Sequence, residues 1–150
     1  MAESHPEVLL QIRDLVAGFD TDDGQVTAVD GVSFDVHKGR TLGIVGESGC
    51  GKSVTALSIM RLLPQPMGKI LGGQVLFDSM NLATVDSAKM RTVRGNRISM
   101  IFQEPMTALN PVHRIGKQIC EVLTQHKDLS PDEAWLKAIE MLDKVGIPSP

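Results

Sequence analysis

Hydrophobic and polar residues alternate along much of the first forty positions of the chain. Residues 8–13 and 32–37 show the period of two that is typical of a β-strand. Asp-Gly at positions 23–24 suits a tight hairpin turn, and residues 26–29 are expected to form the returning strand. These patterns predict a small antiparallel β layer of three short strands over about residues 7–40.

The pattern changes after residue 40. Residues 41–45 are apolar without clear alternation, which predicts a strand buried on both faces. Residues 52–63 are apolar all round and predict a buried helix that stops before Pro64. Two more short strands and one more helix are expected, over residues 74–77, 98–102 and 87–94 respectively. The order strand, loop, helix, strand is typical of the opening of an α/β unit.

The last forty residues predict two amphipathic helices. In the first helix, apolar residues share one face from Ile115 to Leu123. The second helix starts at Ser130, with a serine cap, a proline in the first turn and Glu133 completing a capping box. It is expected to stop at Gly146. Its apolar stripe consists of Trp135, Ala138, Ile139, Leu142 and Val145.

The composition suits one domain of ordinary size with a hydrophobic core. Of the 150 residues, 42% are hydrophobic, and the formal net charge is −3. This charge argues against a nucleic-acid partner held by a basic surface. No apolar run approaches the ~18 residues that span a bilayer, and the acidic start does not resemble a signal peptide. Two cysteines are too few for a disulfide framework, so a soluble chain in a reducing, cytoplasmic setting is expected.

A glycine-rich loop separates the strand expected at 41–45 from the helix that follows. It matches the P-loop pattern G-x-x-x-x-G-K-[ST] with Gly46, Glu47, Ser48, Gly49, Cys50, Gly51, Lys52 and Ser53. Such a backbone forms a nest of inward N–H groups at a helix N-terminus, where anions are favoured. Lys52 is expected to contact the β and γ phosphates of a nucleoside triphosphate, and Ser53 to offer its hydroxyl to Mg²⁺.

The residues around this loop resemble the P-loop region of ABC transporter ATPases. The similarity covers residues 41–55, and a second segment sharpens it, with Ile-Phe-Gln-Glu-Pro-Met at 101–106 and Ala-Leu-Asn-Pro at 108–111. This second segment resembles the Q-loop of the oligopeptide and dipeptide importer branch. The resemblance runs from about Leu9 to Val145. It implies an α/β fold of the P-loop NTPase, ABC type, with an N-terminal antiparallel β layer.

By the same resemblance, residues 1–150 are the N-terminal part of one ABC ATPase domain that is incomplete at its C-terminus. The β layer takes about residues 7–40. The core from P-loop to Q-loop takes about residues 41–110. The start of a helical subdomain takes about residues 111–147.

The resemblance also implies roles for residues outside the loop. Gln103 would contact Mg²⁺ and the attacking water, a suitable task for an amide that coordinates a cation without adding charge. The alternative is a glutamine that simply ends a strand. Phe19 lies where relatives place an aromatic ring on adenine, and the alternative is a core phenylalanine. Val54, directly after Ser53, completes the expected nucleotide-binding residues, and Lys52 shares the catalytic role with Gln103.

Cys50 lies inside the loop, where relatives often carry serine. The helix N-terminus and Lys52 favour its thiolate form, so alkylation is expected to block nucleotide binding and Mg-ATP to protect. The alternative is a small inert side chain. His113, His126 and the eight methionines show no metal-ligand clustering and are expected in solvated or core positions.

Several parts of an ABC ATPase have no match in this sequence. They are the Leu-Ser-Gly-Gly signature, an Asp that ends an apolar strand, the catalytic Glu beside it and a switch His. The chain is therefore expected to be a fragment of a longer protein or a truncated product. A GTPase would show Asn-Lys-x-Asp, which is absent, and a small kinase usually has its P-loop near the start.

The longer protein is expected to bind ATP and Mg²⁺ and to drive import of di- or oligopeptides or related solutes by hydrolysing ATP. Its expected partners are transmembrane permease subunits, a second ATPase domain and, indirectly, a solute-binding protein. Its expected location is the cytoplasmic face of the cell membrane. The alternative is a truncated, non-catalytic module that binds nucleotide or another protein.

Overall fold

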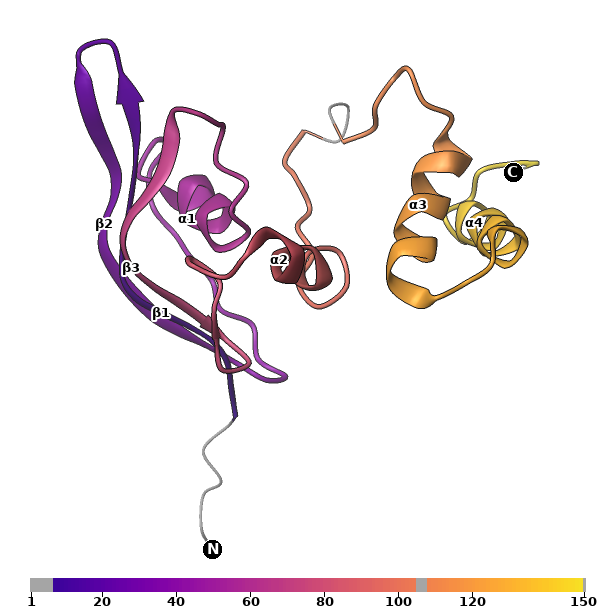
Figure 1. The fold of residues 1–150 in the computed structure, drawn as a ribbon, viewed down its shortest axis with the longest axis horizontal. Helices are drawn as coiled ribbons and strands as arrows, with labels where there is room; N and C mark the ends of the chain where they lie inside the picture. The colour runs from indigo at the N-terminus through magenta and orange to yellow at the C-terminus, as the bar shows by residue number, and fades with distance from the viewer. Residues whose placement is uncertain (1–6, 105–107, 150) are drawn as a thin grey trace, which may run out of the picture. The chain divides into compact units, whose positions relative to one another are not determined.

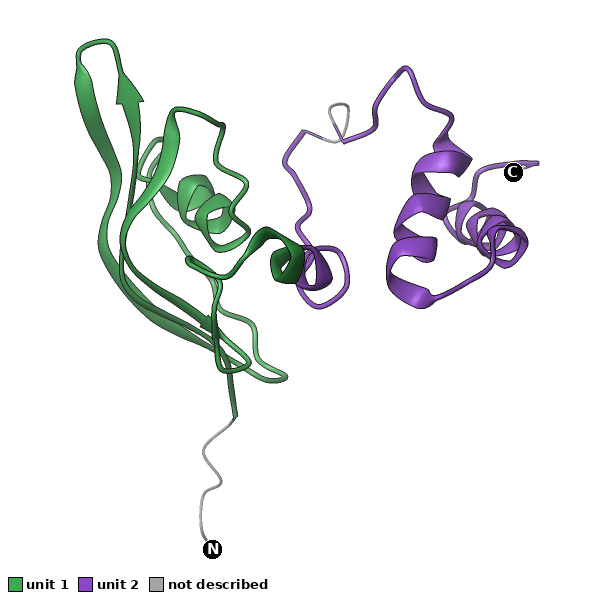
Figure 2. Cartoon of the chain, viewed as in Figure 1, with its two compact units in different colours: residues 1–90 green, residues 91–150 purple. Residues whose placement is uncertain are grey.

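The computed structural model describes residues 7–104 and 108–149, which fall into two compact units, residues 1–90 and 91–150 (Figure 2). In the first unit are β1 (Val8–Thr21), β2 (Gly24–His37), α1 (Lys52–Ile59), β3 (Gly68–Phe77) and β4 (Met80–Asn81). The helix α2 (Ser87–Val93) crosses the division, and the second unit contains α3 (Ile115–Lys127) and α4 (Pro131–Lys144) (Figure 1). No helix in the described residues is long and apolar enough to cross a membrane.

The strands of the first unit form an antiparallel sheet in the order β2-β1-β3-β4. The predicted hairpin is confirmed, because β1 and β2 pair on either side of the turn at residues 22–23. The second and third predicted strands are in fact one strand, since β2 continues through Gly31. Gly31 has a φ of +65°, which glycine adopts easily and which kinks the strand without ending it. β3 is also longer than the predicted strand at 74–77.

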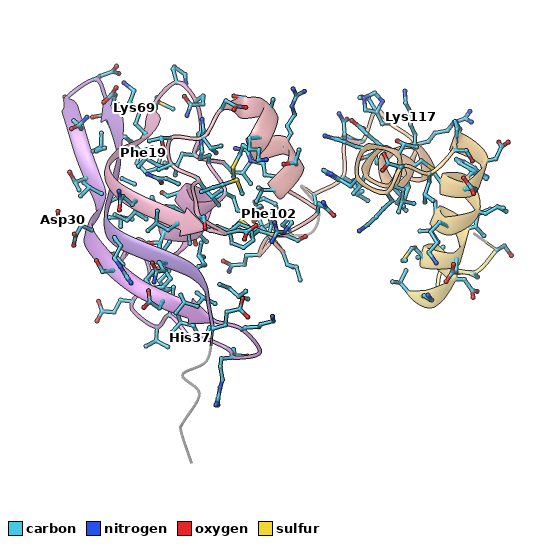
Figure 3. The ribbon with its side chains drawn as sticks, turned by 60° about the horizontal axis from the view of Figure 1, so that its bottom comes forward. Phe19, Asp30, His37, Lys69, Phe102 and Lys117 are labelled. Carbon is cyan, nitrogen blue, oxygen red and sulfur yellow. The ribbon has the colours of Figure 1, made fainter. Side chains whose placement is uncertain are left out.

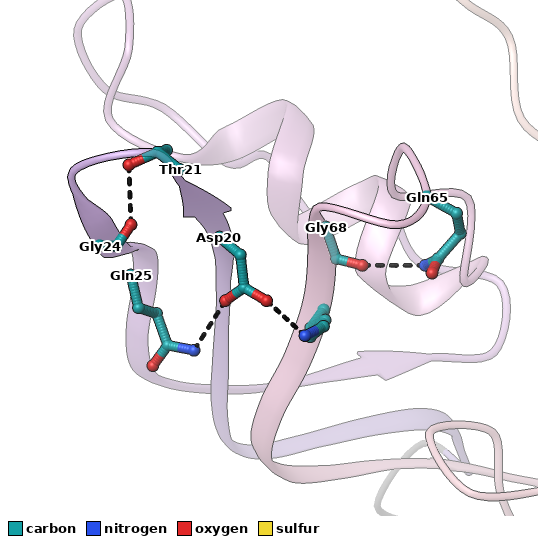
Figure 4. Close-up of polar contacts among 7 residues, drawn as sticks. Asp20, Thr21, Gly24, Gln25, Gln65 and Gly68 are labelled. Atoms are coloured by element: carbon teal, nitrogen blue, oxygen red, sulfur yellow. Dashed lines mark hydrogen bonds and ion pairs between the residues drawn. The ribbon is translucent and has the colours of Figure 1, made fainter.

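Polar side chains link three strands near the tip of the hairpin (Figure 4). The Thr21 hydroxyl donates to the Gly24 carbonyl at 2.7 Å, and the Gln25 amide donates to the Asp20 carboxylate at 3.2 Å. Lys69 of β3 forms an ion pair with the same carboxylate. Hydrogen bonds from Lys69 and then Gln25 lower the pKa of Asp20. The tip of the hairpin is therefore tied to β3 as well as to itself.

The helix α1 lies against the inner face of this sheet (Figure 1). Its predicted span of 52–63 was too long, since it ends at Ile59 and Arg61 has a left-handed φ of +50°. The Leu62 N–H then bonds to the Leu57 carbonyl at 2.8 Å, which turns the chain before Pro64. The buried core of this unit includes Ile12, Leu15, Ala17, Val29, Met60, Leu63, Val75, Phe77 and Leu82.

Two apolar segments that were predicted as strands are not strands. Residues 41–45 belong to no strand, and Val45 is 92% exposed. Residues 98–102 make one isolated bridge at Ile98, and Ile101 is 98% exposed. A strand buried on both faces needs neighbours that bond to its edges and cover its side chains. The described part of the chain supplies no such neighbours, so both predictions are wrong for this structure.

The helices of the second part of the chain lie close to their predicted positions, although much of the predicted apolar stripes, such as Trp135 (51% exposed) and Val145 (73% exposed), is not buried. α2 ends just before Gly95, as predicted. α4 begins with the predicted capping box, in which Glu133 N–H donates to the Ser130 hydroxyl and Ser130 N–H to the Glu133 carboxylate. Hydrogen bonds from the Ser130 side chain and backbone lower the pKa of Glu133. The helix pair α3–α4 packs where the Trp135 ring lies over Gly116, so close that a β-carbon there would be 2.8 Å away.

Candidate nucleotide-binding site

The P-loop leads directly into the first turn of α1. Gly51 is the N-cap of α1, with a left-handed φ of +92° and no side-chain hydrogen bond at the cap. The first turn of the helix also carries no acidic residue. The first N–H groups of a helix have no partner inside the helix and attract anions. This end of α1 therefore suits phosphate oxygens, which would accept from those N–H groups.

Gly51 also fixes the loop against the sheet. A β-carbon at Gly51 would overlap the Ala28 carbonyl of β2, and the nearest side-chain atom, of Val29, would be 3.5 Å away. From the other side, the buried Thr55 hydroxyl donates to the Gly51 carbonyl at 3.0 Å. Only glycine therefore fits at this position, and its close approach to Ala28 brings the loop next to β2.

Replacing Gly51 by alanine is expected to destabilise the first unit. A non-glycine residue at this φ costs about 1–3 kcal/mol, and the overlap with Ala28 adds to that. Urea denaturation should therefore show a lower free energy of unfolding, together with weaker nucleotide binding. The matched control is Gly43→Ala, because a β-carbon at Gly43 meets no atom within 4 Å. Equal unfolding midpoints for the two variants would contradict this role for Gly51.

The Lys52 ammonium lies at the centre of the loop. Its Nζ atom donates to the Gly46 carbonyl at 2.8 Å and to the Glu47 carbonyl at 2.6 Å, and it lies 3.5 Å from the Cys50 sulfur. The positive charge is thus held among the loop atoms, next to the first turn of α1. The adjacent Ser53 is exposed, so its hydroxyl is accessible to a bound ligand.

The remaining predicted nucleotide-binding residues of the loop follow the same path. Ser48 and Gly49 are exposed, and Val54 is half-buried in α1. Beside the loop, a cavity of about 400 Å³ separates β2 from residues 42–45. Its lining is mainly apolar, with Val32, Phe34, Leu42, Ile44 and Val45, but Cys50 and Lys52 of the loop and Thr55 of α1 also line it. The cavity therefore adjoins the loop, and its apolar wall suits apolar side chains.

Phe19 is half-buried near the end of β1, on the same unit as the loop (Figure 3). It pairs with Val26 on one side and Gly68 on the other. The edge of its ring would lie 3.2 Å from a β-carbon on Gly68, so part of the ring packs over that glycine. The adenine contact stays a prediction.

Gln103 lies in the second unit, in an exposed bend outside any helix or strand. Residues 105–107, which belong to the same motif, lie outside the described residues. The contact of Gln103 with Mg²⁺ and water therefore stays a prediction. No group of three His, Cys, Asp or Glu side chains in the described residues could hold a metal ion.

Comparison with known proteins identifies the family of the chain. Residues 29–149 match the sequence profile of the family described as "ABC transporter". The chain belongs to the ABC transporter family. Among solved structures, it is similar to the ATP-binding cassette MJ0796 in a dimeric, post-hydrolysis state bound to ADP and phosphate. That likeness has a TM-score of 0.73 and 21% identity, covers 90% of this chain and 56% of the other, and supports the fold.

Relatives of this ABC family chain with curated names are ATP-binding proteins of peptide transport. A probable peptide ABC transporter ATP-binding protein of Sinorhizobium fredii is 52% identical, over 99% of this chain and 45% of its own. The oligopeptide transport ATP-binding protein OppD of Bacillus subtilis is 49% identical, over 95% of this chain and 40% of its own. The dipeptide transport protein DppD of the same organism is 50% identical, over 96% and 43%. The chain thus spans less than half the length of these relatives.

Two contacts of this ABC family site were missed by sequence reasoning. One is the close approach of Gly51 to the Ala28 carbonyl, which lies in a distant part of the chain. No sequence pattern predicts that contact. The other is the hydrogen bond from Thr55 to Gly51, which has a signal, because a threonine inside a helix often bonds to the carbonyl four residues earlier.

Cys50 covers the start of the loop. Its Sγ atom lies over Gly46, where a β-carbon would be only 2.6 Å from the sulfur. The residue is exposed, and its sulfur is close to the Lys52 ammonium. A bulky group on this sulfur would enter the space in which phosphates are expected.

Alkylation of Cys50 with N-ethylmaleimide is therefore expected to block nucleotide binding. Mg-ATP at ten times its dissociation constant should slow the modification about tenfold, since only the free protein reacts. Mass spectrometry of the labelled peptides gives both rates. Cys120 is the internal control, because it lies on α3 in the other unit and should react at the same rate with or without nucleotide. Equal protection of both cysteines, or of neither, would contradict this prediction.

Proposed function

We propose that this chain is the ATP-binding part of a subunit that powers the import of di- or oligopeptides or related solutes. The observation that carries the proposal is the P-loop, with Lys52 at its centre and an uncapped N-terminus of α1. The names of the relatives, at about 50% identity over nearly the whole chain, support peptide transport as the process.

The loop residues would bind the triphosphate before any hydrolysis. N–H groups of the loop and of the first turn of α1 would donate to the phosphate oxygens. The Lys52 ammonium would exchange the Gly46 and Glu47 carbonyls for the β and γ phosphates, and the flexible stem of lysine permits this. Ser53 and Gln103 would hold Mg²⁺, which neutralises charge on the phosphates when bound. Phe19 would contact the adenine ring.

Hydrolysis would need the signature, the catalytic Glu and the switch His, which have no match in this chain but which the longer relatives are long enough to contain. The exposed apolar residues Ile44, Val45 and Ile101 support the presence of further strands in the complete protein, because such strands would cover them. By family resemblance, the complete protein would pair with a second ATPase domain and dock on transmembrane permease subunits. A solute-binding protein would deliver the substrate. The subunit would then work at the cytoplasmic face of the membrane.

Reconstitution tests this proposal. The complete gene product and its permease partner are placed in vesicles with the solute-binding protein, and uptake of a labelled oligopeptide is measured. Uptake is expected with Mg-ATP and not with a non-hydrolysable analogue. A set of free amino acids and sugars serves as the substrate control. Absence of ATP-dependent peptide uptake by an active preparation would count against the peptide importer.

A further inference from the structure

Gly68, the first residue of β3, lies beside the Phe19 ring. The two residues are partners in the pairing of β1 with β3. Gly68 is buried, and a β-carbon there would lie 3.2 Å from the Cε1 atom of the ring. This distance is shorter than the optimal separation of two carbon atoms, about 3.5–4.0 Å, so a side chain would press on the ring. The lack of a side chain at Gly68 therefore sets how closely the ring approaches β3.

The same side of Gly68 faces the chain that leaves α1. A β-carbon at Gly68 would lie 2.7 Å from the Cβ atom of Leu63 and 3.0 Å from the Pro64 carbonyl oxygen. Leu63 is buried in the core, where neighbouring side chains are closely packed, so it has little room to move. The half-buried Phe19 ring has more freedom. A side chain at Gly68 should therefore displace the ring.

Hydrogen bonds hold the short loop between α1 and β3 in place (Figure 4). The Gly68 N–H donates to the Pro64 carbonyl at 2.6 Å, and the Gln65 amide donates to the Gly68 carbonyl at 2.8 Å. The Asp20 N–H, at the end of β1, donates to the Met67 carbonyl at 2.9 Å. The loop is thus closed on itself and bonded to β1 directly after the predicted adenine contact.

This loop continues from the helix whose first turn belongs to the P-loop. At the other end of α1, the Leu62 N–H bonds to the Leu57 carbonyl at 2.8 Å and fixes the turn into the loop. One continuous segment, residues 46–68, therefore runs from the phosphate loop to the glycine beside Phe19. The base and the phosphates of one nucleotide are covalently linked, so the two ends of its site must be placed to match.

We propose that Gly68 is a positioning residue that sets the Phe19 ring for contact with adenine while the P-loop holds the phosphates. The proposal rests on the proposed function, because it requires that Phe19 contacts the base of bound ATP. Gly68 itself touches no nucleotide in this scheme. Its replacement should weaken the part of the affinity that comes from the base and leave the part that comes from the phosphates.

The test compares binding of Mg-ATP with binding of Mg-tripolyphosphate, which has the phosphate chain without the adenosine. Calorimetric titration of the complete gene product gives both affinities. Stacking of a base on an aromatic ring commonly strengthens binding by about 5- to 150-fold, so Phe19→Ala should weaken ATP binding by at least about fivefold. Gly68→Ala should also weaken ATP binding by about fivefold, and should change tripolyphosphate binding by less than about twofold.

Two comparisons separate positioning from a general structural effect. Gly72→Ala, on the same strand, is the matched control, because a β-carbon there would lie 3.8 Å from Val16, an ordinary contact distance. Neither glycine has a positive φ, so alanine brings no backbone strain at either position. The double variant of Phe19→Ala with Gly68→Ala should bind ATP as Phe19→Ala does, since Gly68 acts only through the ring.

Gln65→Ala keeps the proposal testable if Gly68→Ala does not fold. Gln65 is exposed, and its side chain donates to the Gly68 carbonyl, so the variant loosens the loop without adding an atom beside the ring. Loss of this hydrogen bond should weaken ATP binding by about two- to fivefold and leave tripolyphosphate binding unchanged.

The outcomes distinguish the role of Gly68 from the proposed function. Wild-type ATP affinity in folded Gly68→Ala, an equal loss for ATP and tripolyphosphate, or additive losses in the double variant would overturn the positioning role. If only Gln65→Ala folds, its wild-type ATP affinity would do the same. A wild-type protein that binds neither ATP nor tripolyphosphate would instead overturn the proposed function.

Discussion

Replacing Lys52 by alanine is expected to lower the affinity of the 150-residue chain for Mg-ATP by about 10- to 100-fold. A hydrogen bond to a charged group contributes about 1.5–3 kcal/mol, and the ammonium would make such bonds to the phosphates. The structure places this charge where they are expected, since Nζ lies within 2.8 Å of the Gly46 carbonyl at the start of the loop. Calorimetric titration or a fluorescent ATP analogue measures the change.

The control for this variant is Lys38→Ala. Lys38 is an exposed lysine of the same unit, and its Nζ pairs with Glu7 at 2.9 Å, at the surface and outside the loop. Its removal should leave nucleotide affinity unchanged. Since Lys52 also holds the Gly46 and Glu47 carbonyls, unfolding midpoints of both variants are compared to separate lost charge from a loosened loop. If Lys52→Ala binds as tightly as Lys38→Ala, the assigned role of Lys52 is wrong.

The second large expected effect is that the 150-residue chain does not hydrolyse ATP. The 150-residue chain should release no phosphate from ATP above background, although enzymes typically turn over about 1–1,000 times per second. The printed sequence has no match to the signature, the catalytic Glu or the switch His of ABC ATPases. A phosphate-release assay with Mg-ATP measures it, and Lys52→Ala defines the background.

The complete gene product is the positive control for that assay. It would carry the strands and the catalytic groups that the family resemblance requires, and it should hydrolyse ATP when paired. Turnover by the 150-residue chain that disappears on Lys52→Ala would show that residues 1–150 already contain a functional general base for ATP hydrolysis. In that case the proposed need for later residues would be wrong.

Features formed by neighbouring residues were predicted well from the sequence. The capping box of α4 depends on residues 130–133 alone, and both of its hydrogen bonds are present. The turn at residues 22–23 and the end of α2 before Gly95 also depend on a few adjacent residues. The P-loop pattern also lies within eight consecutive positions, and the phosphate contacts expected of it stay predictions. Local stereochemistry is enough to specify such features.

Features that need distant partners were predicted less well. Residues 41–45 have the composition of a buried strand, yet composition does not supply the neighbours to which a strand must bond. The end of α1 was also misplaced, because apolar residues continue to Leu63 while the backbone already turns at Arg61. The helix ends in a local C-terminal turn, in which Arg61 is left-handed and the Leu62 N–H bonds to the Leu57 carbonyl, and the apolar pattern does not show this turn.

The sequence by itself indicated, through its motifs, the family to which the chain belongs, and it predicts where phosphates bind. These depend on the identity and order of residues in short segments. The tertiary structure alone decided which apolar segments are covered, how Gly51 is held against Ala28, and that the Phe19 ring packs beside Gly68. Those contacts arise only when segments separated along the chain meet, and their distances depend on the packing of whole elements.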